Sequence, residues 1–190
     1  MKTIVNNVKD ELIINKSRFI GYLYKVSNQE EINNILNKLK SQYSDATHIC
    51  YAYSLINSKK ACDDGEPNGT AGIPILEVFN KQDLVNILGV VIRYFGGIKL
   101  GSGGLIRAYS NTIRNTLEKT EIKELKKGYL IKITFDYPLN NLINNLIENY
   151  EVVEKEFNEL ITSKIKADDN LLEELKNINQ KYEIIEEIYL

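Results

Sequence analysis

The feature that most constrains the fold of this chain is an abrupt change from an apolar run to a glycine-rich one. Residues 84–95, LVNILGVVIRYF, are almost continuously apolar, which is typical of a strand buried on both faces. Residues 96–104 then hold five of the eleven glycines. Residues 104–120 follow with the periodicity of a helix. The apolar stripe of this helix is predicted to be Ile106, Tyr109, Ile113 and Leu117. We therefore expect a buried strand, a turn and a helix in direct succession.

The glycine cluster has two explanations, which the sequence leaves open. A glycine in an ordered element costs roughly 0.5–1 kcal/mol relative to alanine, so the cluster needs a reason. The architectural reason is a tight turn with close packing of helix on sheet. The functional reason is contact, because a helix N-terminus offers unpaired N–H groups and glycines let an anion approach the main chain. Arg93, Lys99 and Arg107 would add charge-assisted contacts.

Two known phosphate-binding loops do not match this segment. The Walker A loop requires Gly-Lys-Ser or Gly-Lys-Thr, and neither occurs here. The dinucleotide fingerprint begins at Gly101-Ser102-Gly103, but Ile106 stands where its third glycine belongs. We therefore exclude both nucleotide-loop classes and predict a different anion- or RNA-binding surface. Its predicted members are Arg93, Gly96, Gly97, Lys99, Gly101, Ser102, Gly103, Gly104, Arg107, Asn111 and Arg114.

A second group of candidate residues lies upstream, in DATHICYA and CDDGEPNGTAG. One histidine with carboxylates is able to hold Mg²⁺ or Mn²⁺, or to act as an acid–base pair. Turn chemistry alone also explains Asp-Asp-Gly, and a single histidine at a strand start is more often structural. We predict that His48, Asp64 and Glu66 form a candidate second site. We predict no resident metal or cofactor. Cys50 and Cys62 are expected to be buried thiols rather than nucleophiles.

Other elements of the first two thirds follow from local patterns. Residues 11–26 predict two strands with a break near residues 15–17. Ser27, with Glu30 three residues later, predicts a capping box at the start of a helix. Residues 48–56 alternate as a strand, with His48, Cys50, Ala52 and Ser54 on one face. A short helix with Pro74 in its first turn is favoured for residues 73–82.

The pattern changes after residues 124–128, ELKKG, which we interpret as a linker. Residues 128–190 predict the order β-α-β-β-α-β of a ferredoxin-like fold, with Asp168 capping the second helix. The charge changes at the same place. Residues 1–127 hold 18 Lys and Arg against 13 Asp and Glu, whereas residues 128–190 hold 6 against 13. We predict two domains, 1–127 and 128–190, of which the first is suited to an anionic partner.

The N-terminus resembles no signal peptide, and no apolar run approaches the ~20 residues of a membrane span. We expect a soluble cytoplasmic protein with no membrane partner, and a monomer.

Three segments together resemble one protein family. DATHICYAY, DDGEPNGTAGIPIL and VVIRYFGGIKLGSGGLIRAYS are similar to the signature segments of the IMPACT family, of the bacterial YigZ type, and they occur in the family's order. The resemblance covers essentially the whole chain. It implies an α+β fold: a first domain of the left-handed βαβ type, like domain four of elongation factor G and like ribonuclease PH, and a ferredoxin-like second domain, like domain five of elongation factor G.

The resemblance implies less about activity, because the eukaryotic relative is a translational regulator that acts by protein contact and the bacterial members have no established reaction. Three hypotheses follow. The first is a non-catalytic protein that binds RNA or the ribosome. The second is a regulator that contacts a protein partner without RNA. The third is a metal-dependent hydrolase or transferase acting on a phosphorylated small molecule through His48, Asp64 or Glu66.

Overall fold

The computed structural model describes residues 1–190, which divide into two units, Met1–Glu124 and Leu125–Leu190. The N-terminal unit is built on a five-stranded sheet in which every neighbouring pair is antiparallel. Its strand order is β2 (Val8–Ile14), β3 (Ser17–Lys25), β6 (Ile87–Tyr94), β4 (His48–Ser54) and β5 (Lys59–Cys62). Two short strands, β1 (Lys2–Ile4) and β7 (Ile122–Glu124), form a separate pair.

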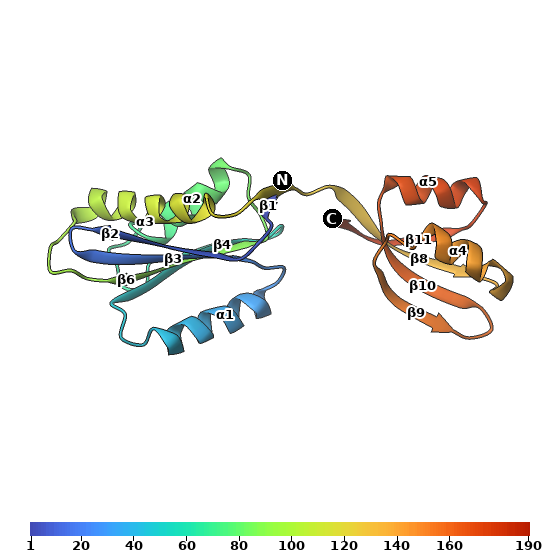
Figure 1. Cartoon of the computed structure of the whole chain (residues 1–190), viewed down its shortest axis with the longest axis horizontal. Coiled ribbons are helices and arrows are strands. Elements are labelled where there is room, and N and C mark those ends of the chain that lie inside the picture. Colours follow the sequence, from blue (N-terminus) through green and yellow to red (C-terminus); the bar gives the residue numbers. More distant parts are fainter. The chain divides into compact units, whose positions relative to one another are not determined.

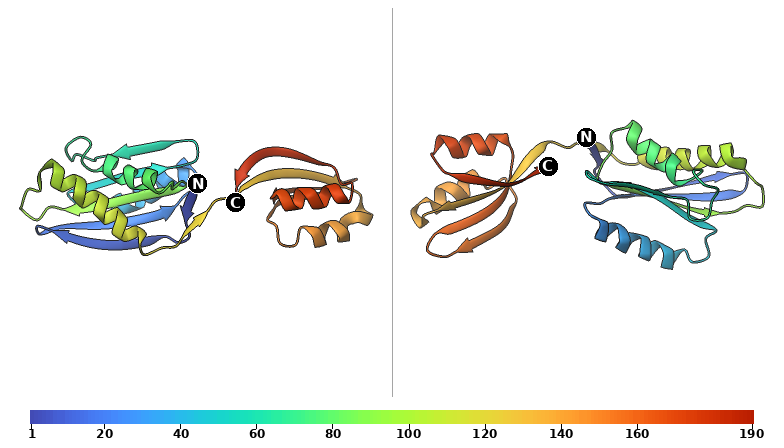
Figure 2. Two further views of the ribbon diagram at one scale, coloured as in Figure 1. Left: turned by 90° about the horizontal axis from the view of Figure 1, so that it is seen from above. Right: turned by 180° about the vertical axis from the view of Figure 1, so that it is seen from behind.

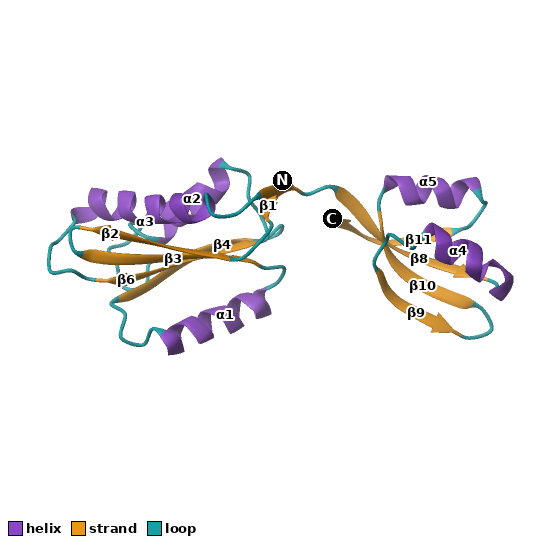
Figure 3. Cartoon of the chain, in the orientation of Figure 1, coloured by secondary structure: helices purple, strands orange, loops and turns teal.

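Helices cover both faces of this sheet, as Figures 1 and 3 show. One face carries α1 (Gln29–Gln42), and the other carries α2 (Gly72–Lys81) and α3 (Gly101–Leu117). The central strand β6 therefore alternates between two cores, with Val91 packed beneath α2 and α3 and Val90 packed toward α1. This confirms the strand buried on both faces and the strand–turn–helix succession that residues 84–120 predict. The α+β fold class is confirmed as well.

Two local predictions need correction. The N-cap of α1 is Asn28, whose Oδ1 accepts the N–H of Glu31 at 2.9 Å, and not Ser27. Ser27 instead donates its own N–H and hydroxyl to the Glu31 carboxylate, so the capping box lies one residue later. In α3, Ile106 is 43% exposed and Leu105 takes its place in the buried stripe. The four-residue spacing from Leu105 to Tyr109 keeps one row of side chains against the sheet.

The glycines of the 96–104 segment serve different needs. A Cβ on Gly96 would lie 2.0 Å from the carbonyl carbon of Lys16, so the chain passes directly over the turn between β2 and β3. Gly97 and Gly101 have φ of +83° and +69°, which favour glycine. A Cβ on Gly103 would meet only Arg107 Nη1, at 3.8 Å. Close packing explains Gly96, and positive φ explains Gly97 and Gly101. Neither reason requires a glycine at position 103.

The C-terminal unit has the element order β-α-β-β-α-β that its sequence predicts, with both helices on one face of the sheet (Figures 1 and 2). The elements are β8 (Lys127–Phe135), α4 (Asn140–Leu146), β9 (Val152–Phe157), β10 (Ile161–Ala167), α5 (Asp169–Asn177) and β11 (Tyr182–Tyr189), with a 3₁₀ turn (Tyr137–Leu139) before α4. The antiparallel strand order is β11-β8-β10-β9. Asp168 caps α5, as expected, by accepting the N–H of Leu171.

The segment 124–128 is not purely a linker. Glu124 ends β7. Lys127 is the first residue of β8 and already pairs with Tyr189 of β11. Backbone bonds between Lys126 and Leu190, at 3.1 and 2.9 Å, draw the segment into the sheet of the C-terminal unit. Across the chain, no helix is long and apolar enough to cross a membrane.

We expect Gly96→Ala to destabilise the N-terminal unit by about 1–3 kcal/mol, because the added Cβ overlaps main-chain atoms that cannot rotate away. Gly103→Ala is the matched control, since it adds the same methyl group to the same segment in open space. It should be neutral, or should stabilise α3 by up to about 1 kcal/mol. Urea unfolding followed by circular dichroism measures both changes, and equal losses would contradict the assigned roles.

Candidate binding site at the end of β6

Arg93 is placed by the two-residue period of β6. Val91 lies in the core beneath α2 and α3, so Arg93 falls on the same face two residues later. Its register partners are His48 on β4 and Phe19 on β3. The side chain of Arg93 is only 6% exposed. Its guanidinium carbon lies 5.4 Å from the ring centroid of Phe19 and 5.5 Å from that of Phe95.

The charge of Arg93 is balanced by Glu66, which lies in the loop between β5 and α2. Arg93 Nη1 donates to Glu66 Oε1 at 2.5 Å, and the hydroxyl of Tyr109 donates to the same oxygen at 2.7 Å. Because the Glu66 side chain is only 3% exposed, this is a buried ion pair. Removing one partner of such a pair leaves a charge in a medium of low dielectric, which costs about 3–5 kcal/mol.

Hydrogen bonds to Asp63 stabilise the loop between β5 and α2. Its carboxylate accepts the N–H groups of Gly69, Ala71 and Gly72 at 2.8–3.0 Å, which ties the loop to the start of α2. Burial opposes ionisation of Asp63, but the three N–H donors outweigh it and lower the pKa of this carboxyl. Helix α2 has no acidic residue in its first turn and no side-chain cap. Asp63 therefore supplies the negative charge at its N-terminus and holds the loop that carries Glu66.

Asp64 and Gly65 turn the chain beneath His48, with φ of 45° and 85°. The Asp64 carboxylate accepts the N–H of Ile49 at 2.6 Å, and its carbonyl oxygen lies 2.8 Å from His48 Nδ1. A carbonyl only accepts, so His48 Nδ1 donates this hydrogen bond. His48 Nε2 is left facing Glu66 Oε2 at 3.9 Å, which is too long for a hydrogen bond.

A cavity of about 430 Å³ lies at the end of β6, and Arg93, Glu66 and His48 line it. The volume falls within the range of about 300–1,000 Å³ that is usual for small-molecule sites. The first turn of α3 and the exposed ring of Phe95 complete its walls. The glycine segment and the His48 group, which are separate in the sequence, thus meet at one place. The predicted residues that line the cavity are His48, Glu66, Arg93, Lys99, Gly101 and Ser102.

Other predicted residues lie outside the cavity. Asp64 does not line it, because its carboxylate is taken by the Ile49 N–H. No three His, Cys, Asp or Glu side chains lie close enough together to hold a metal ion, so His48, Asp64 and Glu66 are not a ligand set. The remaining members of the predicted anion-binding surface also lie outside the lining: Gly96, Gly97, Gly103, Gly104, Arg107, Asn111 and Arg114.

The site also contains residues that the predicted set lacks. Tyr109 packs edge-on against Phe19 in the core, as its helical position predicts, but its hydroxyl also donates to Glu66 Oε1. Burial, with Cys50 and Glu66 nearby, raises the pKa of Tyr109, so the hydroxyl keeps its hydrogen and donates. Burial likewise raises the pKa of the Cys50 thiol, as expected of a structural cysteine. The helical stripe signals that Tyr109 points inward, but no local pattern names its partner.

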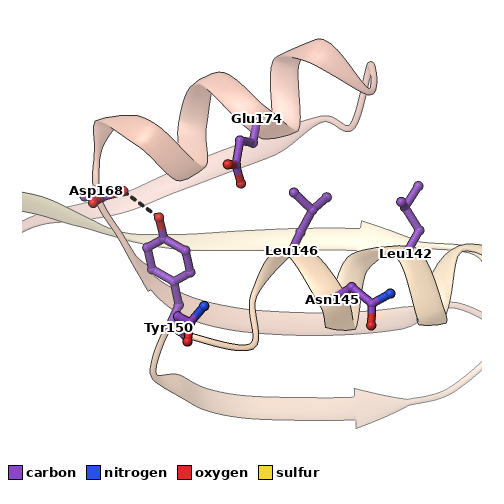
Figure 4. A pocket seen from close by; sticks show the side chains of 7 residues that line it. Leu142, Asn145, Leu146, Tyr150, Asp168 and Glu174 are labelled. Atoms are coloured by element: carbon purple, nitrogen blue, oxygen red, sulfur yellow. Dashed lines mark hydrogen bonds between the residues drawn. The ribbon is translucent and has the colours of Figure 1, made fainter.

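A second cavity, of about 590 Å³, lies in the C-terminal unit between α4 and α5 (Figure 4). Figure 4 shows Tyr150 directed at Asp168, to which its hydroxyl donates at 2.9 Å. Burial and this bond raise the pKa of Tyr150 to about 12. The pair holds the turn after α4 against the cap of α5, and most of the other lining side chains are exposed. We therefore place the candidate site in the N-terminal unit.

The residues that surround the β6 cavity fall within a recognised domain. The model described as the Impact N-terminal domain matches residues 15–117. The chain belongs to the IMPACT family. It is 41% identical over 157 residues to the IMPACT family member YvyE of Bacillus subtilis, and this alignment covers 81% of this chain and 72% of YvyE. It is 37% identical over 122 residues to YigZ of Escherichia coli, and this alignment covers 62% of this chain and 57% of YigZ.

A crystal structure described only as that of a hypothetical protein aligns over 97% of both chains, with a TM-score of 0.76 and 24% identity, and shows the same fold. The match to the family model and to these two relatives confirms the family resemblance of the three sequence segments.

We expect Arg93→Met to destabilise the protein by about 3–5 kcal/mol, because it leaves Glu66 buried without its cation. Arg93→Met combined with Glu66→Gln should cost clearly less than the sum of the two single changes. A double-mutant cycle by urea unfolding measures this coupling. The exposed pair Arg18–Glu11, at 2.8 Å, is the control and should couple by only about 0–1 kcal/mol. Equal coupling in the two cycles would show that burial does not strengthen the Arg93–Glu66 pair.

Asp63 should make the free energy of unfolding depend on pH. A carboxyl whose pKa is lowered by folding contributes stability above its ordinary pKa, and this contribution disappears as the pH falls through the lowered value. We expect Asp63→Asn to reduce the free energy of unfolding at pH 7 by about 1–2 kcal/mol. The difference between wild type and variant should shrink below pH of about 4. Unfolding curves from pH 7 to pH 3 test this, and a difference that stays constant with pH would refute it.

Proposed function

We propose that this protein is a non-catalytic RNA-binding regulator associated with translation, and that it binds RNA through the exposed face of α3 and the glycine segment before it. The observation that carries the proposal is the charge of this surface. Lys99, Arg107 and Arg114 are exposed, and residues 84–117 contain no Asp or Glu. Lys99 and Arg107 therefore have no acid near them along the chain, and the next acid, Glu118, lies four residues after Arg114. Exposed cations with few neighbouring acids are what a phosphate backbone requires.

The geometry of α3 supports this assignment. Arg107, Asn111 and Arg114 recur at the spacing of one helical face, and Arg114 Nη1 donates to Asn111 Oδ1 at 3.1 Å. Phe95 and Ile98 in the adjoining segment are 46% and 44% exposed. An exposed aromatic ring beside cations offers a base a stacking surface. Arg93, which the sequence also places in this set, is buried against Glu66 and is not available to a polymer.

A protein partner is the second candidate function, and a different observation favours it. Phe95, Ile98 and Ile106 are large apolar side chains that are all exposed in or beside the glycine segment. Exposed apolar groups rimmed by polar ones are typical of protein contact. The acidic 128–190 segment would then contribute to recognising a basic partner. A charged surface that binds RNA weakly or not at all would favour this candidate over the first.

The RNA proposal predicts a salt-dependent affinity that is localised to α3. We expect single-stranded RNA to bind the protein less tightly after Lys99→Gln, Arg107→Gln and Arg114→Gln are combined. Three lost phosphate contacts should reduce the slope of log K against log salt by about 2. Fluorescence anisotropy with a labelled oligonucleotide at several salt concentrations measures the slope.

The matched control for this titration removes the same charge from the other side of the N-terminal unit. Lys9, Lys38 and Lys40 are exposed. The last two lie on α1, on the opposite face of the sheet from α3 (Figure 1), and Lys9 lies over the ring of Tyr22, which packs in the core beneath α1. Their combined replacement by glutamine should leave most of the affinity intact. Equal losses in the two triple variants would mean that net charge alone attracts RNA, and the assignment to α3 would then be wrong.

A further inference from the structure

We propose that the cavity at the end of β6 binds a phosphate-bearing nucleotide, either a free nucleoside monophosphate or the terminal nucleotide of an RNA. This small-ligand site is distinct from the exposed face of α3 and does not depend on that face binding RNA. Three parts of the cavity match three parts of the ligand: a buried polar end, a positive end at the start of α3, and an aromatic wall.

The buried polar end contains groups that lack partners. Both donors to Glu66, from Arg93 and Tyr109, reach Oε1, so Oε2 accepts no hydrogen bond within the protein, and His48 Nε2 lies 3.9 Å from it. Arg93 Nε is also buried without a partner. Buried polar groups are nearly always hydrogen-bonded. A sugar hydroxyl is able to donate to Glu66 Oε2.

The positive end is formed by the start of α3. No side chain caps this helix, its first turn has no acidic residue, and Leu100 stands at the N-cap. Gly101 and Ser102 line the cavity here together with Lys99, and a Cβ on Gly101 would meet nothing within 4 Å. Free N–H groups, a hydroxyl and an ammonium in open space suit a phosphate group.

The net charge favours an anion over a cation at this end. The charges of Arg93 and Glu66 cancel within their ion pair, which leaves Lys99 and the helix dipole without an opposing carboxylate among the lining residues. Glu66 alone would repel a phosphate, but its Oε1 already holds two donors, and its side chain is buried whereas Lys99 and Gly101 are exposed. The cavity is therefore suited to a ligand with a phosphate at one end and hydroxyls at the other.

The aromatic wall distinguishes a nucleotide from a simple sugar phosphate. Arg93 lies 5.5 Å from the centroid of the Phe95 ring, which is nevertheless 46% exposed. Leu105 and Pro67 add apolar surface to the lining. A ring with one face supported by a cation and another part open is suited to stack a base.

Isothermal titration calorimetry of the whole chain with AMP, UMP, adenosine, ribose 5-phosphate and inorganic phosphate tests the proposal. We expect AMP or UMP to saturate one site, with adenosine and ribose 5-phosphate at least 10-fold weaker. Lys99→Gln and Phe95→Leu, both at exposed positions, should each weaken the nucleotide 3-fold or more. Arg114→Gln, which lies outside the cavity, should leave nucleotide affinity unchanged while weakening RNA, which separates this site from the α3 face.

Oligonucleotides that differ only in a terminal phosphate identify the source of the ligand. Tighter binding of phosphorylated ends, abolished by Lys99→Gln, supports an RNA terminus. Saturable AMP or UMP without any end effect supports a free nucleotide. Saturation by ribose 5-phosphate as tight as by AMP would overturn the nucleotide assignment. The absence of both saturable mononucleotide binding and an end effect, in protein whose unfolding curve is normal, would overturn the proposal whether or not RNA binds α3.

Discussion

The ion pair between Arg93 and Glu66 is the interaction on which the arrangement of the N-terminal unit depends. It places two opposite charges beneath α3, where neither is tolerated alone. Each must therefore be held in position by its own element: Arg93 by the register of β6, and Glu66 by a loop that Asp63 ties to α2. Tyr109 brings α3 to the same carboxylate oxygen. Strand, loop and helix are thus fixed to one another by polar contacts inside an otherwise apolar core.

This arrangement separates the positive charges of the chain into two classes. Arg93 is neutralised internally and shapes a cavity, whereas Arg107 and Arg114 face solvent along α3 and remain free to attract an anion. Lys99 stands between them, exposed but lining the cavity. A polymer and a small ligand would therefore meet different cations on neighbouring surfaces. The exposed cations attract anions at long range. Arg93 contributes little to this attraction, because Glu66 largely cancels the field of its guanidinium.

Periodicity and turn chemistry predict most of the fold from the sequence, because these signals are local. The buried strand β6, the helix α3 and the β-α-β-β-α-β order of the second unit all follow from the spacing of apolar residues. Where two local solutions are nearly equal, the pattern fails: Ser27 and Asn28 both stand three residues before a glutamate, and Leu105 and Ile106 are neighbours of similar size. Packing against the sheet, which no local window contains, decides between them.

The site was predictable in its members more than in its geometry. Arg93, His48 and Glu66 were recognisable as polar residues in otherwise apolar or turn segments, but 27 positions separate Glu66 from Arg93 and 43 separate it from Tyr109. Their meeting depends on the antiparallel register of β3, β6 and β4, which sets His48 and Phe19 beside Arg93. Asp64 lies in the same loop as Glu66, but its carboxylate accepts the N–H of Ile49 on β4 and does not reach the cavity.

The contact of Gly96 with the turn between β2 and β3 has a consequence for the length of that turn. Hairpin tips are ordinarily places where chains gain and lose residues at little cost. Here Asn15 and Lys16 adopt left-handed backbone angles, and the main chain of the glycine segment rests on them. An insertion at this tip would push apart the segment that forms the mouth of the cavity. The length of a surface turn is thereby fixed by a neighbour distant in sequence.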